Sequence, residues 1–117
     1  MGKNVVLVKS KAFAIRIIRM YQYWCNEKHE FVLSKQVLRS GTSIGANIKE
    51  ANRGQSRADF YAKMIIALKE SSETEYWLEL LHETGYLSDA EFNGIYADCQ
   101  ELLHLLMAIT KNQEKAQ

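Results

Sequence analysis

The chain has 117 residues, of which 47% are hydrophobic and 25% are charged, and its formal net charge is +1. This composition predicts one folded domain over residues 1–117 and excludes a largely disordered protein. No apolar run approaches the roughly 20 residues of a membrane span, and no export signal is found, so we expect a cytoplasmic protein that does not bind membranes.

The small net charge hides a strong asymmetry along the chain. Residues 1–57 contain eleven Lys or Arg against three Asp or Glu, a net charge of +8. Residues 58–117 contain four basic against eleven acidic residues, a net charge of −7. Such a split can mark a half that binds anions. The alternative is that the two halves attract each other, within one bundle or between subunits.

The first predicted helix runs from Ser10 to Lys28, after a short lead with the sequence NVVLV. Long helices are permitted because the chain has no proline. The apolar arc of this helix covers nearly half its circumference. Its members are Phe13, Ala14, Ile17, Ile18, Met20, Tyr21, Trp24 and Cys25. Cys25 and Cys99 both fall on apolar arcs, which favours buried free thiols over a redox pair.

The second predicted helix begins at Ser34, which is a good N-cap, and ends at Gly54. At about 100° per residue, one side is apolar and the opposite side carries four cations, Lys35, Arg39, Lys49 and Arg53. Gly41 and Gly45 lie inside this helix, where each costs about 1 kcal/mol relative to alanine. Two explanations stay open: close approach of a neighbouring backbone, or a kink.

The third predicted helix starts after Ser56 and ends before Gly85, and Ser88 with Glu91 forms a capping box for the fourth. The apolar side of the third helix is expected to contain Phe60, Tyr61, Met64, Ile65, Leu68 and Ser72. The stripe of the fourth helix contains Phe92, Ile95, Tyr96, Cys99, Leu102, Leu103, Leu106 and Ile109, and the tail from Lys111 is expected to fray. Because the connections are short, the fold class is an all-α, antiparallel, up-down-up-down four-helix bundle.

The third helix is apolar on more than one side, which indicates contact with a second subunit or a partner. Tyr76, Trp77 and Leu81 are the expected oligomer interface, since aromatic residues are enriched in interface cores. The alternative is that Trp77 packs at the end of the bundle core.

Polar residues border these apolar sides and could form one polar seam. The seam consists of Ser43, Asn47, Glu50, Glu70, Glu75 and Glu79. The last two carboxylates need a partner or water, because burying an unpaired charge costs several kcal/mol.

Three segments carry a resemblance that covers nearly the whole chain. They are SKQVLRSGTSIGANIKEA, SRADFYAKMIIALKESSETEYWLELL and GYLSDAEF. Together they resemble the bacterial four-helix-bundle proteins encoded in intervening sequences of 23S ribosomal RNA genes, a family related to the accessory variability protein of diversity-generating retroelements. The resemblance implies a small cytoplasmic bundle of unknown function that assembles as a homopentamer, with a suspected role in binding RNA. It offers no catalytic residues.

The residues themselves argue against an enzyme. His29, His82 and His104 are far apart in sequence and make no metal-ligand spacing, and GTSIG lies inside a helix without a phosphate-loop signature. Glu50 with Glu70 or Glu75 is better explained by structural hydrogen bonding than by acid–base catalysis. We therefore expect no catalytic residues, no metal and no cofactor.

Two functions remain open. The first is electrostatic binding of RNA or DNA through a basic face on the first two helices, multiplied by oligomerisation. Its expected residues are Arg16, Arg19, Lys35, Arg39, Lys49, Arg53 and Arg57. No aromatic residues interleave these cations to stack on bases. The second is an oligomeric scaffold that docks a protein partner and has no affinity for nucleic acid.

Overall fold

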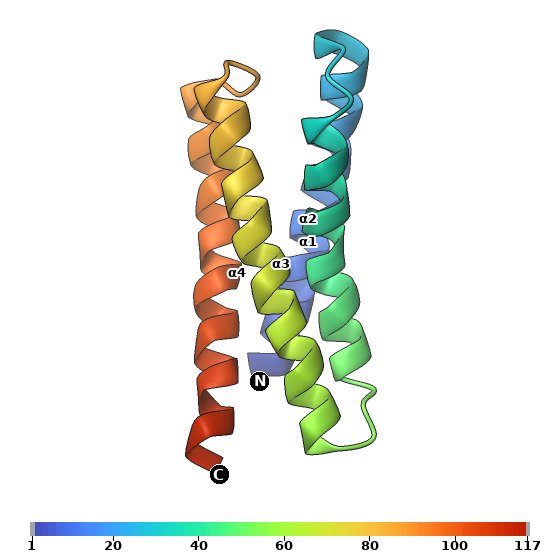
Figure 1. Ribbon diagram of the computed structural model, residues 1–117, viewed down its shortest axis with the longest axis vertical. Coiled ribbons are helices and arrows are strands. Elements are labelled where there is room, and N and C mark those ends of the chain that lie inside the picture. Colours follow the sequence, from blue (N-terminus) through green and yellow to red (C-terminus); the bar gives the residue numbers. More distant parts are fainter. Residues whose placement is uncertain (1, 117) are drawn as a thin grey trace.

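A computed structural model describes the backbone of residues 2–116 and the side chains of residues 5–112. Its α-helices are α1 (Gly2–Tyr23), α2 (Leu33–Ala51), α3 (Arg57–Glu83) and α4 (Asp89–Ala116), and a π-helical turn, η1 (Trp24–Lys28), extends α1. Figure 1 shows the helices side by side with alternating direction, the N- and C-termini lying at the same end. The fold is the predicted all-α four-helix bundle, with no strand in residues 2–116.

Ion pairs between neighbouring helices confirm the antiparallel order. Arg39 of α2 pairs with Glu70 of α3, whereas Glu50, further along α2, pairs with Lys63, earlier in α3. Residue numbers therefore rise along one helix as they fall along its neighbour. The bundle is elongated, with extents of 47 × 21 × 21 Å.

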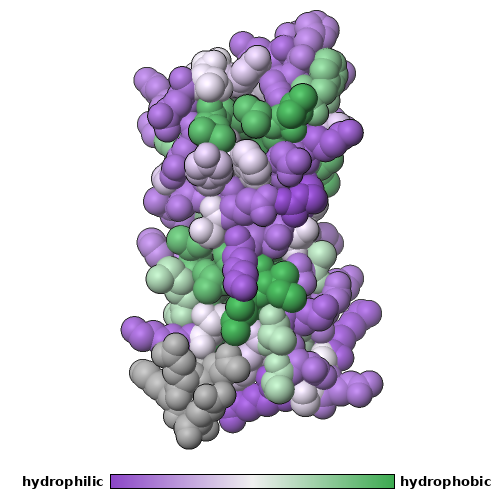
Figure 2. Space-filling model, in the orientation of Figure 1, coloured by the Kyte–Doolittle hydropathy of each residue, from purple (hydrophilic) through white to green (hydrophobic). Residues whose placement is uncertain are grey.

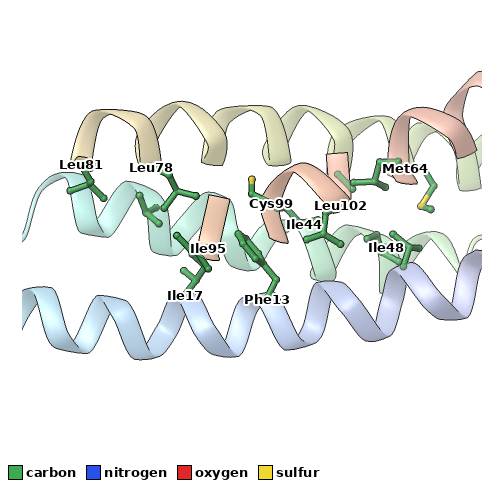
Figure 3. Packing of buried hydrophobic residues seen from close by; sticks show 14 of the residues in the cluster. Phe13, Ile17, Ile44, Ile48, Met64, Leu78, Leu81, Ile95, Cys99 and Leu102 are labelled. Atoms are coloured by element: carbon green, nitrogen blue, oxygen red, sulfur yellow. The ribbon is translucent and has the colours of Figure 1, made fainter. Parts of the chain in front are cut away.

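One hydrophobic core runs along the bundle and receives side chains from all four helices. Figure 3 shows Phe13 and Ile17 of α1 packed toward Ile95 of α4, with residues of α2 and α3 closing the other sides. The largest fully buried side chains are Val6, Ile17, Trp24, Val37, Ile44, Ile48, Met64, Leu78, Leu81, Ile95, Leu102 and Leu106. Burying each such side chain contributes about 1.5–3 kcal/mol of transfer free energy.

The start of α1 corrects the prediction. The helix begins at Gly2, eight residues before the expected Ser10, so the presumed lead is helical. Val6, Ser10, Phe13 and Ile17 are all buried, at the i, i+4, i+7 and i+11 spacing of one helix face. Burial of Val6 thus extends the helix through residues whose β-branched side chains alone would not favour it.

The N-cap of α2 also differs from the prediction. Ser34 lies inside the helix, and the buried Glu30 caps it instead. The Glu30 carboxylate accepts hydrogen bonds from the backbone N–H groups of Val32, Leu33 and Ser34. Ser34 Oγ in turn donates to the Glu30 carbonyl at 2.7 Å. A carboxylate at a helix N-terminus satisfies free donors and interacts favourably with the helix dipole.

The caps predicted for α3 and α4 are confirmed. Ser56 Oγ accepts from the Asp59 N–H at 3.1 Å. Ser88 and Glu91 form a reciprocal capping box, with bonds of 2.9 and 3.2 Å. Gly85, just after α3, has a φ of 88°, which glycine adopts without strain. The backbone of α4 is helical as far as Ala116, and no glycine or proline interrupts it after Gly94.

The two glycines within α2 permit close approach of α1, and α2 continues through both without interruption. A Cβ on Gly41 would lie 3.1 Å from two γ carbons of Ile17, and one on Gly45 would lie 3.2 Å from Ser10 Oγ. Of the two explanations left open by the sequence, close helix packing is therefore the correct one.

The buried row of α3 is rotated from the predicted side. Its buried residues are Tyr61, Met64, Ala67, Ser71, Thr74, Leu78 and Leu81. Small and hydroxyl-bearing residues occupy the middle of the row. Thr74 Oγ1 donates to Ser40 Oγ of α2 at 2.8 Å, and Ser71 Oγ donates to the Leu68 carbonyl. The hydropathy pattern did not mark these positions as core because their side chains are polar, but hydrogen bonds satisfy their hydroxyl groups in the buried row.

Candidate nucleic-acid interface

Lys35 and Lys49 are exposed on the outward side of α2, and Arg53, expected within this helix, is exposed in the turn that follows the helix end at Ala51. None of the three has an ion pair within the part of the chain that the structure describes. Lys35 and Lys49 are fourteen residues apart, which corresponds to about 21 Å along the helix. These side chains remain available to a polyanion.

The fourth expected cation of α2 is already neutralised within the bundle. Arg39 pairs with Glu70 of α3 at 3.1 Å, and its other terminal nitrogen contacts Glu73. The Arg39 side chain is turned toward α3 and joins the two helices. Its primary role is therefore structural.

The cations expected on α1 divide in the same way. Arg16 pairs with Asp98 of α4 at 2.7 Å. Its guanidinium lies against Gly94, where an added Cβ would be only 2.6 Å from Nη2. Arg19 is exposed, with no ion pair among the described residues. Arg57, at the start of α3, lies 5.8 Å from the centre of the Tyr61 ring and makes a cation–π contact.

Lys11 belongs to the same surface but was not among the expected residues. It follows Ser10, which contacts Gly45 of α2, and Lys49 lies about one turn beyond Gly45. Lys11 is exposed, with no ion pair within the described residues. Because Ser10 lies against Gly45, the neighbouring Lys11 lies near the contact between α1 and α2, which sequence spacing alone does not show. Besides Lys28, which lies at the turn between α1 and α2, the cations of residues 5–57 without an ion pair are Lys11, Arg19, Lys35, Lys49, Arg53 and Arg57, and we call these six the open basic surface.

The predicted polar seam is not one site, because its members lie on two different sides of α3. On the side of α2, Glu50 pairs with Lys63 at 2.9 Å, Glu70 pairs with Arg39, and Asn47 Nδ2 donates to the Ser43 carbonyl. On the side of α4, Glu79 accepts a hydrogen bond from Tyr96 Oη at 2.5 Å. Glu75 and Glu79 are both half-buried rather than enclosed.

The contact between α3 and α4 perturbs two titratable groups. The hydrogen bond to Glu79, followed by burial, raises the pKa of Tyr96 well above its usual value. Burial, with smaller contributions from Glu75 and other nearby carboxylates, raises the pKa of the Cys99 thiol to about 12. Both groups are held in their neutral forms, which is the opposite of an activated nucleophile. The described residues contain no cluster of three or more potential metal ligands.

The expected oligomer interface is only partly available at the surface. Leu81 is fully buried in the core of its own bundle, so its assignment to a subunit contact is wrong. Trp77 is half-buried against that core, and its Nε1 donates to Glu73 at 2.8 Å. Tyr76 is 54% exposed and remains free to contact another molecule.

Hydrophobic side chains also reach the surface elsewhere on α3 and α4. Figure 2 shows two hydrophobic areas on this face of the molecule, separated by a hydrophilic band. A shallow hollow of about 650 Å³ lies between the two helices, lined mainly by Ile65, Leu68, Met107 and Ala108. Among the described residues, no helix is long and apolar enough to cross a membrane.

The turn between α1 and α2 exposes an aromatic residue that was not expected near the cations. Phe31 is 54% exposed and is followed by the still more exposed Val32, and Tyr23, the last residue of α1, is 41% exposed. The signal in the sequence is the apolar Phe31–Val32 pair, which falls between two helices and outside the stripe of either.

Comparison with known proteins identifies relatives of the whole bundle. A family model described as 23S rRNA-intervening sequence protein matches residues 2–108. A crystal structure of a protein of unknown function from the S23 ribosomal protein family of Bacteroides thetaiotaomicron is similar, with a TM-score of 0.93 and 56% sequence identity. The match covers 95% of this chain and 99% of that chain. No curated protein is detectably similar. Neither match indicates an enzyme family.

Proposed function

The chain belongs to the 23S rRNA-intervening sequence protein family, and from this premise we propose that it is a non-enzymatic, homo-oligomeric bundle of the cytoplasm that binds RNA. The RNA contacts are made by the open basic surface of α1, α2 and the start of α3. Arg16 and Arg39, which pair within the bundle, support this surface rather than forming it.

The observation that supports this proposal most strongly is the distribution of ion pairs. The acidic half of the chain neutralises Lys9, Arg16 and Arg39 but leaves the outward cations of α2 without carboxylate partners in the described structure. Each phosphate that such a cation neutralises releases condensed counterions, which is the main source of affinity for nucleic acids. Contacts of this kind recognise the phosphate backbone and tolerate many base sequences.

Oligomerisation strengthens the proposal because it repeats the open basic surface. The resemblance implies a homopentamer, and the exposed Tyr76 beside the half-buried Trp77 supports a subunit contact on α3. Several weak surfaces on one particle bind a long polyanion far more tightly than one surface does.

A protein scaffold without affinity for RNA is the second candidate function. The observation that favours it is the hydrophobic hollow between α3 and α4, since exposed apolar areas often mark protein contacts. The scaffold would be favoured over RNA binding if the protein assembles normally but does not bind RNA at low salt.

A charge-reversal pair tests the proposed function. We expect Lys49→Glu combined with Arg53→Glu to weaken RNA binding about tenfold or more, because two phosphate contacts become repulsive. The matched control is Lys69→Glu combined with Lys111→Glu, which changes the net charge equally on the acidic half. Fluorescence anisotropy with a labelled RNA measures both. Equal losses for the two variants, or none for either, would contradict the proposal.

A further inference from the structure

The turn between α1 and α2 presents exposed apolar side chains that the bundle itself does not use. Val32 is 74% exposed, Phe31 is 54% exposed and Tyr23 is 41% exposed. The apolar contact that anchors this end of α2 comes from the half-buried Leu33 instead. Water-exposed phenylalanine and valine at the tip of a hairpin contribute little to folding stability, and this favours a role in binding.

The backbone of this turn is firmly held, although its side chains point outward. The buried Glu30 accepts N–H groups from Val32, Leu33 and Ser34, and the Glu30 N–H donates to the Trp24 carbonyl at 3.1 Å. His29 is held with a φ of 52°, a left-handed conformation unusual for a residue other than glycine. A surface fixed in advance binds a ligand without the entropic cost of ordering a loop.

From this arrangement we propose that the α1–α2 turn is a stacking site for an unpaired nucleobase, with Phe31 as the main stacking surface and His29 beside it. The inference rests on the proposed RNA binding and gives it a second element. The open basic surface recognises phosphates, while the turn selects single-stranded RNA by receiving one base.

The ring geometry suits a flat, aromatic ligand. The centres of the His29 and Phe31 rings are 6.5 Å apart, with their planes inclined at 47°. The two rings are therefore not stacked on each other, and both residues are exposed. A planar base adds its face to an exposed aromatic ring in the manner common to single-strand-binding proteins.

The charges around the turn suit the sugar-phosphate backbone on either side of such a base. Lys28 and Lys35 are exposed, with no ion pair in the described part of the chain. The opposing carboxylates are Glu27, which is exposed, and Glu30, whose charge is held by the N-terminus of α2. The apolar area is a few side chains wide, far smaller than the roughly 800 Å² per partner of a stable protein interface. A single base is the ligand that matches this size.

Matched RNA probes test the inference. The probes are a single-stranded 12-nucleotide RNA that contains 2-aminopurine and the duplex of the same sequence, in which the bases are already paired. We expect Phe31→Ala to weaken binding of the single strand roughly 5- to 150-fold, the range seen when a stacking aromatic residue is removed. Binding of the duplex should change less than about twofold, and the quenching of 2-aminopurine that the wild type produces should disappear.

Phe31→Trp and Val32→Ala serve as controls. The first retains a stacking ring and should preserve single-strand affinity, and the second removes exposed apolar surface without removing a ring. If Phe31→Ala leaves single-strand affinity unchanged while Lys49→Glu with Arg53→Glu lowers it, the stacking site is wrong and the proposed RNA function stands. If Phe31→Ala instead lowers the oligomer mass, the turn is a subunit contact. If the wild type binds neither probe at low salt, both proposals fail.

Discussion

Cys99 shows how burial of a single side chain fixes its chemistry. Its thiol lies fully buried between α3 and α4, and Sγ contacts the Ser71 carbonyl at 3.4 Å. Desolvation, reinforced by nearby carboxylates, raises its pKa from 9.0 to about 12. The folded state therefore keeps a proton that the unfolded state releases above pH 9. The contribution of Cys99 to the free energy of unfolding is therefore fully present below about pH 9, and it is lost as the pH rises toward 12.

This linkage predicts an alkaline loss of stability to which Cys99 makes a contribution of its own, beginning at a lower pH than that of Tyr96. Between pH 8 and 10, the free energy of unfolding of the wild type should fall by on the order of 1 kcal/mol because of Cys99. Cys99→Ala should be less stable at pH 8, since it leaves a small cavity, but it should lack most of this decline. Urea denaturation at several pH values measures the slope. Cys25→Ala is the matched control, and a decline in Cys99→Ala equal to that of the wild type would refute the argument.

Helix ends illustrate which elements can be predicted from sequence. The caps of α3 and α4 depend on residues within three positions of each other, as with Ser56 and Asp59, so they could be predicted. The cap of α2 was not predicted although Glu30 lies only two to four residues from its partners, because Glu is not among the preferred N-cap residues and the π-helical turn and the left-handed His29 place it there. Likewise, sequence alone could not predict that Arg39 is paired and Lys49 is not. The difference depends on which carboxylates of α3 lie beside each residue, and this is set by tertiary packing.

Two glycines that face α1, Gly41 of α2 and Gly94 of α4, are predicted to differ in how well they tolerate alanine. Gly41→Ala should destabilise the bundle by about 1–3 kcal/mol, offset by up to about 1 kcal/mol of helix propensity, because its Cβ meets the stiff, β-branched Ile17. Gly94→Ala meets only the end of the flexible, half-exposed Arg16 side chain, so it should be neutral or stabilising. Denaturant unfolding compares the two variants. Equal destabilisation by both would show that α1 is not packed against α2 through Gly41.

At the scale of the whole molecule, the charge asymmetry of the sequence has two consequences. Part of it is neutralised within the bundle through Lys9, Arg16 and Arg39, as one of the two interpretations expected. The remainder stays without ion pairs among the described residues of the basic half, where the other interpretation, anion binding, stays a prediction. Composition alone could not divide the cations between these outcomes, because the division depends on the antiparallel register of the helices.

Assembly is the second property of the whole molecule that can be tested. We expect the wild type to have a mass several times the 13.5 kDa of one chain. Tyr76→Glu should give smaller species, because it places a charge on the exposed aromatic surface of α3. Tyr23→Glu changes another half-exposed tyrosine in the same way and should keep the wild-type mass. Multi-angle light scattering measures all three, and an unchanged mass for Tyr76→Glu would remove this residue from the subunit contact.

The most direct test of the central claim, that unpaired cations of α1 and α2 bind RNA phosphates, is the salt dependence of duplex RNA affinity. A plot of log affinity against log salt concentration should be steep for the wild type, with a slope of about −0.9 for each phosphate neutralised. For Lys49→Glu with Arg53→Glu, the slope should be shallower by about 1.8, the contribution of two phosphates. A wild-type slope near zero, or a slope that only Lys69→Glu with Lys111→Glu reduces, would contradict the account.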